Sequence, residues 1–145
     1  SEDDVATVLS AGFTMIGSDA SARAIDGPTA HGVPHPRTFG CFPRVFSRYV
    51  RTLGVLSTEE AVRRMTSLPA AAFGLRDRGV VALDAYADLV LCDEKAITDM
   101  ATYERPFAYP LGISDVWVNG RRVLANGEQT TARPGRVLRH GGVPA

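Results

Sequence analysis

The hydrophobic pattern of the chain changes its period once, close to residue 75. Up to that point apolar residues recur at helical spacing, and in the segment 39–53 they fall on a single helical face. After Gly74 they come in short runs bounded by glycine, asparagine and aspartate, which is typical of strands. A chain of this kind places amphipathic helices first and a small sheet last. We therefore predict two domains, residues 1–74 and residues 75–145.

The first part contains recognisable helix starts and one short apolar run. Ser1 is followed by acidic residues, which suit the positive end of a helix dipole. Residues 57–60 (Ser-Thr-Glu-Glu) form a capping box that predicts a later helix. The helix between these two should begin near Phe42, because Pro43 is tolerated only in a first turn. The apolar run 13–17, bounded by glycines, predicts a buried strand.

The second part contains several short predicted strands. They are expected at 79–82, 87–92, 113–118, 121–125 and 128–131. Asn119-Gly120 is a strong signal for a two-residue hairpin turn, and Asn126-Gly127 turns the chain again. A lone strand, two amphipathic helices and a small sheet would leave apolar faces uncovered. Since the chain also begins with Ser1 rather than methionine, we expect the end of a larger protein.

Composition excludes several classes of function. The 145 residues are 45% apolar and 22% charged, as in soluble globular proteins. Sixteen basic residues balance sixteen acidic ones, so neither a nucleic-acid partner nor a membrane surface is indicated. The two cysteines, Cys41 and Cys92, leave a disulfide open but favour free thiols in a reducing compartment, and hence a cytoplasmic protein.

Asp19 is the first residue that suggests chemistry. It directly follows the predicted strand 13–17, and barrel enzymes place catalytic carboxylates just beyond the C-terminal ends of strands. From position alone, a turn or cap residue is the more common explanation. His31 and His35 have a spacing that places two metal ligands on one helical face, but glycine and prolines between and beside them oppose a helix. We therefore assign them no metal role.

Several arginines and a cysteine have two interpretations each. Arg37 has the planar fork that binds a substrate carboxylate, and equally it would cap a carbonyl or pair with a nearby acid. Arg44, Arg48 and Arg51 form a helical stripe, for which a solvated face is the first expectation and an acidic partner surface the second. Cys41 lies near a helix start, but we expect a buried structural thiol there.

A series of short motifs resembles the N-acyl-D-amino-acid deacylases, the D-aminoacylase family of the amidohydrolase superfamily. Residues 15–19 (Met-Ile-Gly-Ser-Asp), 35–40 (His-Pro-Arg-Thr-Phe-Gly) and 42–45 (Phe-Pro-Arg-Val) resemble the last barrel strand of these enzymes and the loop after it. The further matches are 59–66 with 68–70, 74–79, 87–90 and 116–120. Each motif is short, but together they cover most of the chain in the right order.

The resemblance implies an α/β fold: the last strand and helices of a metal-dependent (β/α)8 amidohydrolase barrel, followed by part of a small β-sandwich. It implies hydrolysis of the amide bond of N-acyl-D-amino acids, with zinc lowering the pKa of a bound water. Asp19 matches the aspartate that handles the proton of that water, and His35 and Arg37 are candidate substrate contacts. The other metal ligands of the family have no counterpart here, so we expect this chain alone to bind no zinc and to be inactive.

Two alternative functions remain open, and the sequence differs from the family motif at one position near Asp19. Another amidohydrolase branch, such as a dihydroorotase or dihydropyrimidinase relative, would share the barrel aspartate but not the motif Phe-Pro-Arg-Val. A non-catalytic module is the second alternative, self-associating or pairing with an N-terminal barrel segment. The departure is Ala20, because the family commonly has glycine after the aspartate. An alanine there would alter the turn that aims Asp19.

Overall fold

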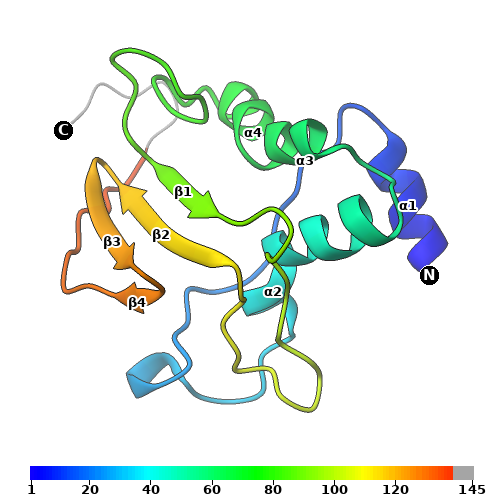
Figure 1. Cartoon of the computed structure of the whole chain (residues 1–145), viewed down its shortest axis with the longest axis horizontal. Helices are drawn as coiled ribbons and strands as arrows, with labels where there is room; N and C mark the ends of the chain where they lie inside the picture. The colour runs from blue at the N-terminus through cyan, green and yellow to red at the C-terminus, as the bar shows by residue number, and fades with distance from the viewer. Residues whose placement is uncertain (139–145) are drawn as a thin grey trace.

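The computed structural model describes residues 1–138 and consists of a helical group and a small sheet side by side (Figure 1). The helices are α1 (Glu2–Ser10), the 3-10 turn η1 (Gly27–Thr29), α2 (Arg37–Arg44), the π-helix η2 (Val45–Thr52), α3 (Thr58–Met65) and α4 (Ser67–Ala72). The strands are β1 (Leu89–Cys92), β2 (Ile113–Val118), β3 (Arg121–Ala125) and β4 (Glu128–Gln129). The last seven residues of the predicted second domain, 139–145, lie outside the described residues.

Both predicted helices have their serine N-caps, but the capping box predicted at residues 57–60 is only half formed, since the Glu60 carboxylate binds arginines and not the Ser57 backbone. The Ser1 hydroxyl accepts the Asp4 backbone N–H at 3.3 Å, and the Asp4 carboxylate binds back to Ser1, which completes a capping box at the start of α1. At α3, the Ser57 hydroxyl accepts the Glu60 backbone N–H at 3.2 Å. The Glu60 carboxylate is bound to two arginines of its own helix.

The helix expected to begin near Phe42 begins at Arg37 instead. Pro36 occupies the N-cap position, and the Thr38 backbone N–H donates to the His35 carbonyl at 2.9 Å. Pro43 lies inside α2, where its missing N–H leaves the Phe39 carbonyl without its helical donor. The backbone then widens into the π-helix η2, so one continuous helical segment accommodates the proline by a change of hydrogen-bond register.

The predicted strands 13–17 and 79–82 are not formed. Within residues 1–138 no strand lies beside either of them, and a strand without a paired neighbour has no ladder to hold it. Phe13 is 81% exposed, and the single backbone bond that ties the segment to a helix runs from the Ile16 N–H to the Arg64 carbonyl at 3.2 Å. Asp19 therefore follows an irregular segment.

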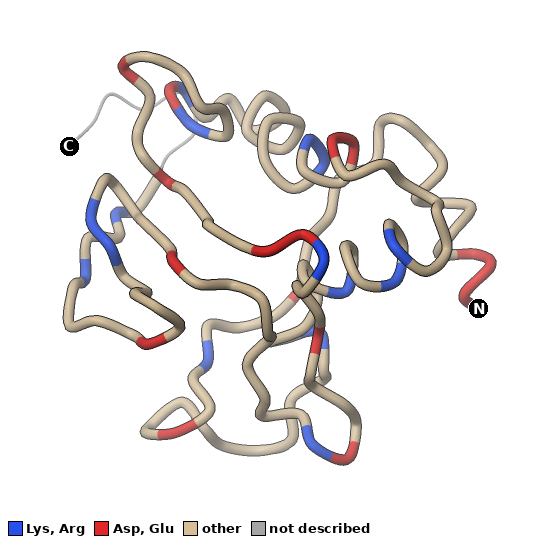
Figure 2. The backbone as a smooth tube through the Cα atoms, in the orientation of Figure 1, with Lys and Arg blue, Asp and Glu red and all other residues tan. Residues whose placement is uncertain are grey.

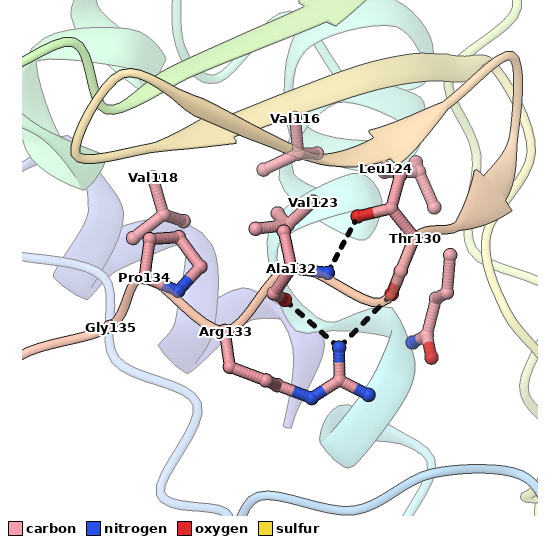
Figure 3. A pocket seen from close by; sticks show the side chains of 10 residues that line it. Val116, Val118, Val123, Leu124, Thr130, Ala132, Arg133, Pro134 and Gly135 are labelled. Atoms are coloured by element: carbon pink, nitrogen blue, oxygen red, sulfur yellow. Dashed lines mark hydrogen bonds between the residues drawn. The ribbon is translucent and has the colours of Figure 1, made fainter.

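The sheet is an antiparallel meander in the order β1-β2-β3-β4. Asn119 and Gly120 both have positive φ, 47° and 75°, which confirms the predicted hairpin turn between β2 and β3. Asn126 and Gly127 repeat this geometry before β4, which is shorter than predicted. The segment after β4 returns along the β2–β3 hairpin, and an apolar groove of about 520 Å³ lies between them (Figure 3).

Two ion pairs brace this sheet, and the sequence did not indicate either. Asp115 on β2 is buried and accepts hydrogen bonds from the Arg122 guanidinium and from the Asn126 backbone N–H at 3.2 Å. The hydrogen bond from Arg122 holds the pKa of Asp115 below its ordinary value. Arg78 pairs with Asp88, whose other carboxylate oxygen accepts the Asn119 backbone N–H at 2.7 Å. The turns of the meander are thus fixed by carboxylates.

The arginine stripe of α2 and η2 contacts carboxylates and carbonyls of the same chain. Figure 2 marks the basic positions of this helical segment in blue. Arg48 donates to the Glu2 carboxylate at 2.8 Å, and Arg44 pairs with Asp99 at 3.2 Å. Arg51 donates to the Ile97 carbonyl at 2.6 Å. The arginine side chains stay partly exposed, 44% for Arg44 and 36% for Arg48, as expected for a solvated face. In addition, they pair with groups of the N-terminus and of the segment after β1, which was not expected.

Arg64 joins the helices at the centre of the helical group. Its side chain is only 3% exposed and donates to the Glu60 carboxylate at 2.6 Å, the Leu9 carbonyl at 2.7 Å and the Ala11 carbonyl at 2.9 Å. A fourth bond reaches the Thr14 hydroxyl at 2.6 Å. The guanidinium therefore satisfies carbonyls at the end of α1 that have no helical partner. The adjoining apolar core consists of Leu9, Val45, Tyr49, Leu56 and Ala61.

No helix among residues 1–138 is long and apolar enough to cross a membrane.

Replacing Arg64 with methionine should lower the free energy of unfolding by about 3 kcal/mol, because the partly exposed Glu60 carboxylate and two carbonyls at the end of α1 lose a buried charged donor. Urea denaturation followed by circular dichroism measures this loss. Arg63→Gln is the matched control, since Arg63 shares the Glu60 carboxylate but is partly exposed. Its effect should be much smaller. Equal losses in both variants would show that burial of Arg64 is not what stabilises this junction.

Acid should weaken the same junction. Hydrogen bonds from Arg63 and Arg64 lower the pKa of Glu60 from 4.5 to about 2. A carboxyl group with a lowered folded-state pKa stabilises the fold above its unfolded pKa, and this contribution is lost as pH falls from about 4.5 toward 2. The stability difference between wild type and Glu60→Gln should therefore be full at pH 7 and shrink across that range. A difference that stays constant down to pH 2 would contradict the assigned ion pairs.

Candidate functional site

Asp19 lies on the surface at the start of the long loop between α1 and α2. Its φ is 47°, a left-handed conformation that aspartate adopts more readily than most residues. The side chain is 90% exposed and its Oδ2 accepts a hydrogen bond from the Arg37 guanidinium at 2.7 Å. The helix N-terminus that carries Arg37 thus lies beside the carboxylate. Of the two interpretations of Arg37, pairing with a nearby acid is the one that the structure shows.

His35 and Arg37 belong to one tight turn at the start of α2. The Arg37 backbone N–H donates to His35 Nδ1 at 3.0 Å. His35 Nε2 lies 2.9 Å from the hydroxyl of Tyr103, and the two rings meet edge to face with centroids 5.1 Å apart. Since Nδ1 accepts a proton-bearing amide, the neutral ring carries its hydrogen on Nε2 and donates it to Tyr103. All three predicted site residues therefore lie in one hydrogen-bonded group.

Tyr103 is a member of this group that the sequence did not reveal. It belongs to the irregular segment between β1 and β2, far from Asp19 along the chain and without any periodic pattern. Its side chain is 71% exposed. The only signal in the sequence is a run of aromatic residues within a proline-containing loop, and that signal does not indicate a partner.

The remaining loop residues do not join the group through their side chains. The His31 carbonyl accepts a hydrogen bond from Arg23, and the Thr29 hydroxyl accepts the Ala24 backbone N–H at 2.9 Å. These bonds close the loop on itself around η1.

The two cysteines are free thiols. Cys41 is half-buried with its Sγ 3.7 Å from the Gly17 carbonyl, and burial raises the pKa of the thiol. Burial also raises the pKa of Cys92. A raised pKa reduces the thiolate fraction, and the thiolate is the form that attacks substrates and binds metals. Both cysteines therefore fit a structural role.

The described residues do not make a metal centre by themselves. Between residues 1 and 138, no group of three or more histidine, cysteine, aspartate and glutamate side chains gathers closely enough to hold an ion. The side chain paired with Asp19 is the Arg37 guanidinium, which cannot bind a metal ion.

Residues 3–124 match the amidohydrolase family. The chain belongs to this family. It is 44% identical to D-aminoacylase of Alcaligenes xylosoxydans xylosoxydans over 94% of this chain and 27% of that protein. It is 42% identical to N-acyl-D-glutamate deacylase of the same organism, over 95% of this chain and again 27% of the relative. The chain therefore spans about a quarter of the length of the curated relatives it matches.

Solved structures give the same result. A D-aminoacylase structure, described as having a binuclear metal centre, matches 91% of this chain and 26% of its own with 44% identity and a TM-score of 0.81. An N-acyl-D-glutamate deacylase from Bordetella bronchiseptica, in complex with zinc and a phosphonate that mimics the tetrahedral intermediate, has 40% identity and a TM-score of 0.81 over 96% of this chain and 28% of its own. These comparisons confirm the resemblance to the D-aminoacylase family that the sequence motifs indicated.

Asp19→Asn should change the free energy of unfolding by less than about 1 kcal/mol, because exposed ion pairs contribute little and asparagine tolerates positive φ. Thermal unfolding of the variant measures this. A loss of several kcal/mol would mean that the pair with Arg37 is structural, and would remove the main reason for treating Asp19 as a reactive residue.

Proposed function

We propose that this chain is the C-terminal part of a metal-dependent N-acyl-D-amino-acid deacylase. Residues 1–74 would complete the (β/α)8 barrel, and residues 75–145 would supply the C-terminal share of a small β-sandwich. Support comes from identities of 40% to 44% to D-aminoacylases and N-acyl-D-glutamate deacylases over nearly the whole chain. The substrate would be a small N-acyl-D-amino acid, and the place of action the cytoplasm.

The single observation that carries the proposal is the Asp19 carboxylate, which is exposed and pairs with the Arg37 guanidinium. A general base must reach the proton it removes, and an exposed carboxylate on a turn is free to do so. Asp19 would accept a proton from the attacking water and deliver it to the leaving nitrogen. The relatives' structures contain zinc or a binuclear metal centre, so we infer a zinc-dependent enzyme. Because residues 1–138 gather no metal site, ligation would fall to the rest of the enzyme.

Arg37 would have two tasks in the complete enzyme. One terminal nitrogen of its guanidinium binds Asp19 at 2.7 Å. The other guanidinium N–H groups have no hydrogen-bond partner among residues 1–138, and a guanidinium fork suits the carboxylate of an amino acid. The residue would hold the base in place and bind the substrate carboxylate beside it. His35, in the same turn, would define the rim of that pocket.

The irregular segment 13–17 fits this proposal. Its apolar side chains Phe13 and Met15 are exposed, and its backbone has one bond to a helix. A sequence with strand character gains a ladder only when neighbouring strands flank it. In a complete barrel, strands from the rest of the enzyme would flank these residues, and Asp19 would then lie at the C-terminal end of a strand.

The similar proteins are named D-aminoacylase and N-acyl-D-glutamate deacylase, which favours the deacylase over the cyclic-amide alternative. No contact in the structure favours the non-catalytic module over the enzyme.

A chimera tests the proposal directly. The matching segment of a D-aminoacylase is replaced by this chain, and hydrolysis of N-acetyl-D-amino acids is followed by release of the free amino acid. The chimera should be active, and Asp19→Asn should lower kcat by about 100-fold or more, as expected for loss of a general base. Asp26→Asn is the matched control, since Asp26 is an exposed loop aspartate without a side-chain cap bond, and it should retain activity.

Two outcomes would overturn the proposal. A folded, zinc-loaded chimera without deacylase activity would show that this chain does not complete such a site. Full activity of Asp19→Asn would show that the carboxylate handles no proton.

A further inference from the structure

The segment between β1 and β2 forms a loop with a closed neck. The Asp93 backbone N–H donates to the Gly112 carbonyl at 2.8 Å, and Thr98 and Leu111 exchange two backbone bonds at 3.1 and 3.2 Å. Gly112 has a φ of 82°, and a Cβ there would collide with the Ile97 backbone. Only glycine therefore allows the neck to close so tightly. The loop beyond it is presented from a fixed base.

This loop, residues 98–111, rests on the helix that follows the candidate site. Asp99 accepts hydrogen bonds from the Ser47 hydroxyl at 2.7 Å and from Arg44 at 3.2 Å. The Asp99 side chain also lies directly over Gly40, where a Cβ would stand 3.0 Å from the Asp99 Cβ. Helix and loop thus approach each other closely, and their relative position is set by charge as well as by shape.

Three aromatic residues of the loop then contact the segment around the site. Tyr103 meets His35 by a hydrogen bond of 2.9 Å and an edge-to-face ring contact. Phe107 and Tyr109 pack against Phe39 of α2 with ring centroids 5.9 and 5.8 Å away. Of these, only the Tyr103 contact reaches His35, whose ring accepts the Arg37 backbone N–H. The other two hold the first turn of the helix itself.

The contact with Tyr103 has a consequence for Arg37. His35 Nε2 is engaged by the Tyr103 hydroxyl, so the ring is held with Nδ1 toward the chain, where it accepts the Arg37 backbone N–H at 3.0 Å. Without the hydroxyl, the ring could rotate about its side-chain bonds, and the Arg37 amide would lose its acceptor. The side chain of Arg37 starts from that backbone position and ends on Asp19.

We infer that Tyr103 is a positioning residue of the site: through His35 it sets the turn that places Arg37 beside Asp19, and so it governs recognition of the substrate carboxylate. The inference rests on the proposed deacylase function. The inference goes beyond the proposed function because it assigns a role to Tyr103. This residue belongs to the second half of the chain and approaches the site only in the folded protein.

Hydrogen exchange in the chimera tests the contact without reference to activity. In Tyr103→Phe the ring remains and only the hydroxyl is lost. Exchange of peptides that cover residues 35–39 should become about threefold to tenfold faster, the effect of one hydrogen bond. Arg105→Gln is the matched control, because Arg105 lies on the same turn and its side chain makes no hydrogen bond or ion pair within residues 1–138. It should leave that exchange unchanged.

Kinetics tests the consequence. Tyr103→Phe should raise KM for an N-acetyl-D-amino acid by about threefold to tenfold and leave kcat within about twofold, because the lost interaction orders substrate binding and not the proton transfer. In a His35→Asn background, the asparagine can still accept the Arg37 amide but has no contact for the hydroxyl. There, Tyr103→Phe should have no further effect on KM.

The outcomes separate the two hypotheses. If the unmodified chimera is active but KM is unchanged in Tyr103→Phe, the inference is overturned and the proposed function stands. Faster exchange with unchanged KM also overturns it, because the contact would then be structural only. An inactive, folded chimera overturns the proposed function, and the role of Tyr103 falls with it.

Discussion

The buried guanidinium of Arg64 is the interaction on which the helical half depends. A charge removed from water is tolerated only when its donors are satisfied, and here they reach the Glu60 carboxylate and carbonyls at the end of α1. The Arg64 backbone carbonyl also accepts the Ile16 N–H, just before Asp19. One residue of α3 therefore fixes the end of α1 and the approach to the candidate site.

The site itself is carried by turns, and its geometry comes from contacts between distant segments. Asp19 has a left-handed backbone, Arg37 lies at a helix start, and Tyr103 lies in a loop of the second half. Such exposed groups contribute little to stability, so they are free to serve chemistry. Contacts next to the site hold these segments together. They are the closed neck of the loop at Gly112 and the ion pair between Asp99 and Arg44 of the arginine stripe. The proposed site would therefore consist of exposed polar groups on a rigid base, as functional loops often do.

The comparison with amidohydrolase relatives shows that this chain corresponds to only part of a longer protein. The chain spans 27% of its curated relatives, whose names include D-aminoacylase and N-acyl-D-glutamate deacylase. A binuclear metal centre is described for one solved relative, whereas residues 1–138 contain no cluster of three or more histidine, cysteine, aspartate or glutamate side chains that could hold an ion. In the proposed enzyme, this chain would contribute the Asp19 carboxylate and its cationic partner Arg37.

The sequence by itself determined the local features of the structure. The serine caps, the Asn-Gly turns and the strands around them were predictable, because each depends on the dihedral preferences and hydrogen bonds of neighbouring residues. The motifs around Asp19 likewise identified the family. The segment 13–17 failed as a strand because pairing needs a distant partner. The ion pairs of the arginine stripe were not predicted, because its acidic partners lie far along the chain. Only the tertiary structure brought Tyr103 to His35 and Arg37 to Asp19, since loop closure over long sequence separations leaves no periodic trace in the residues that meet.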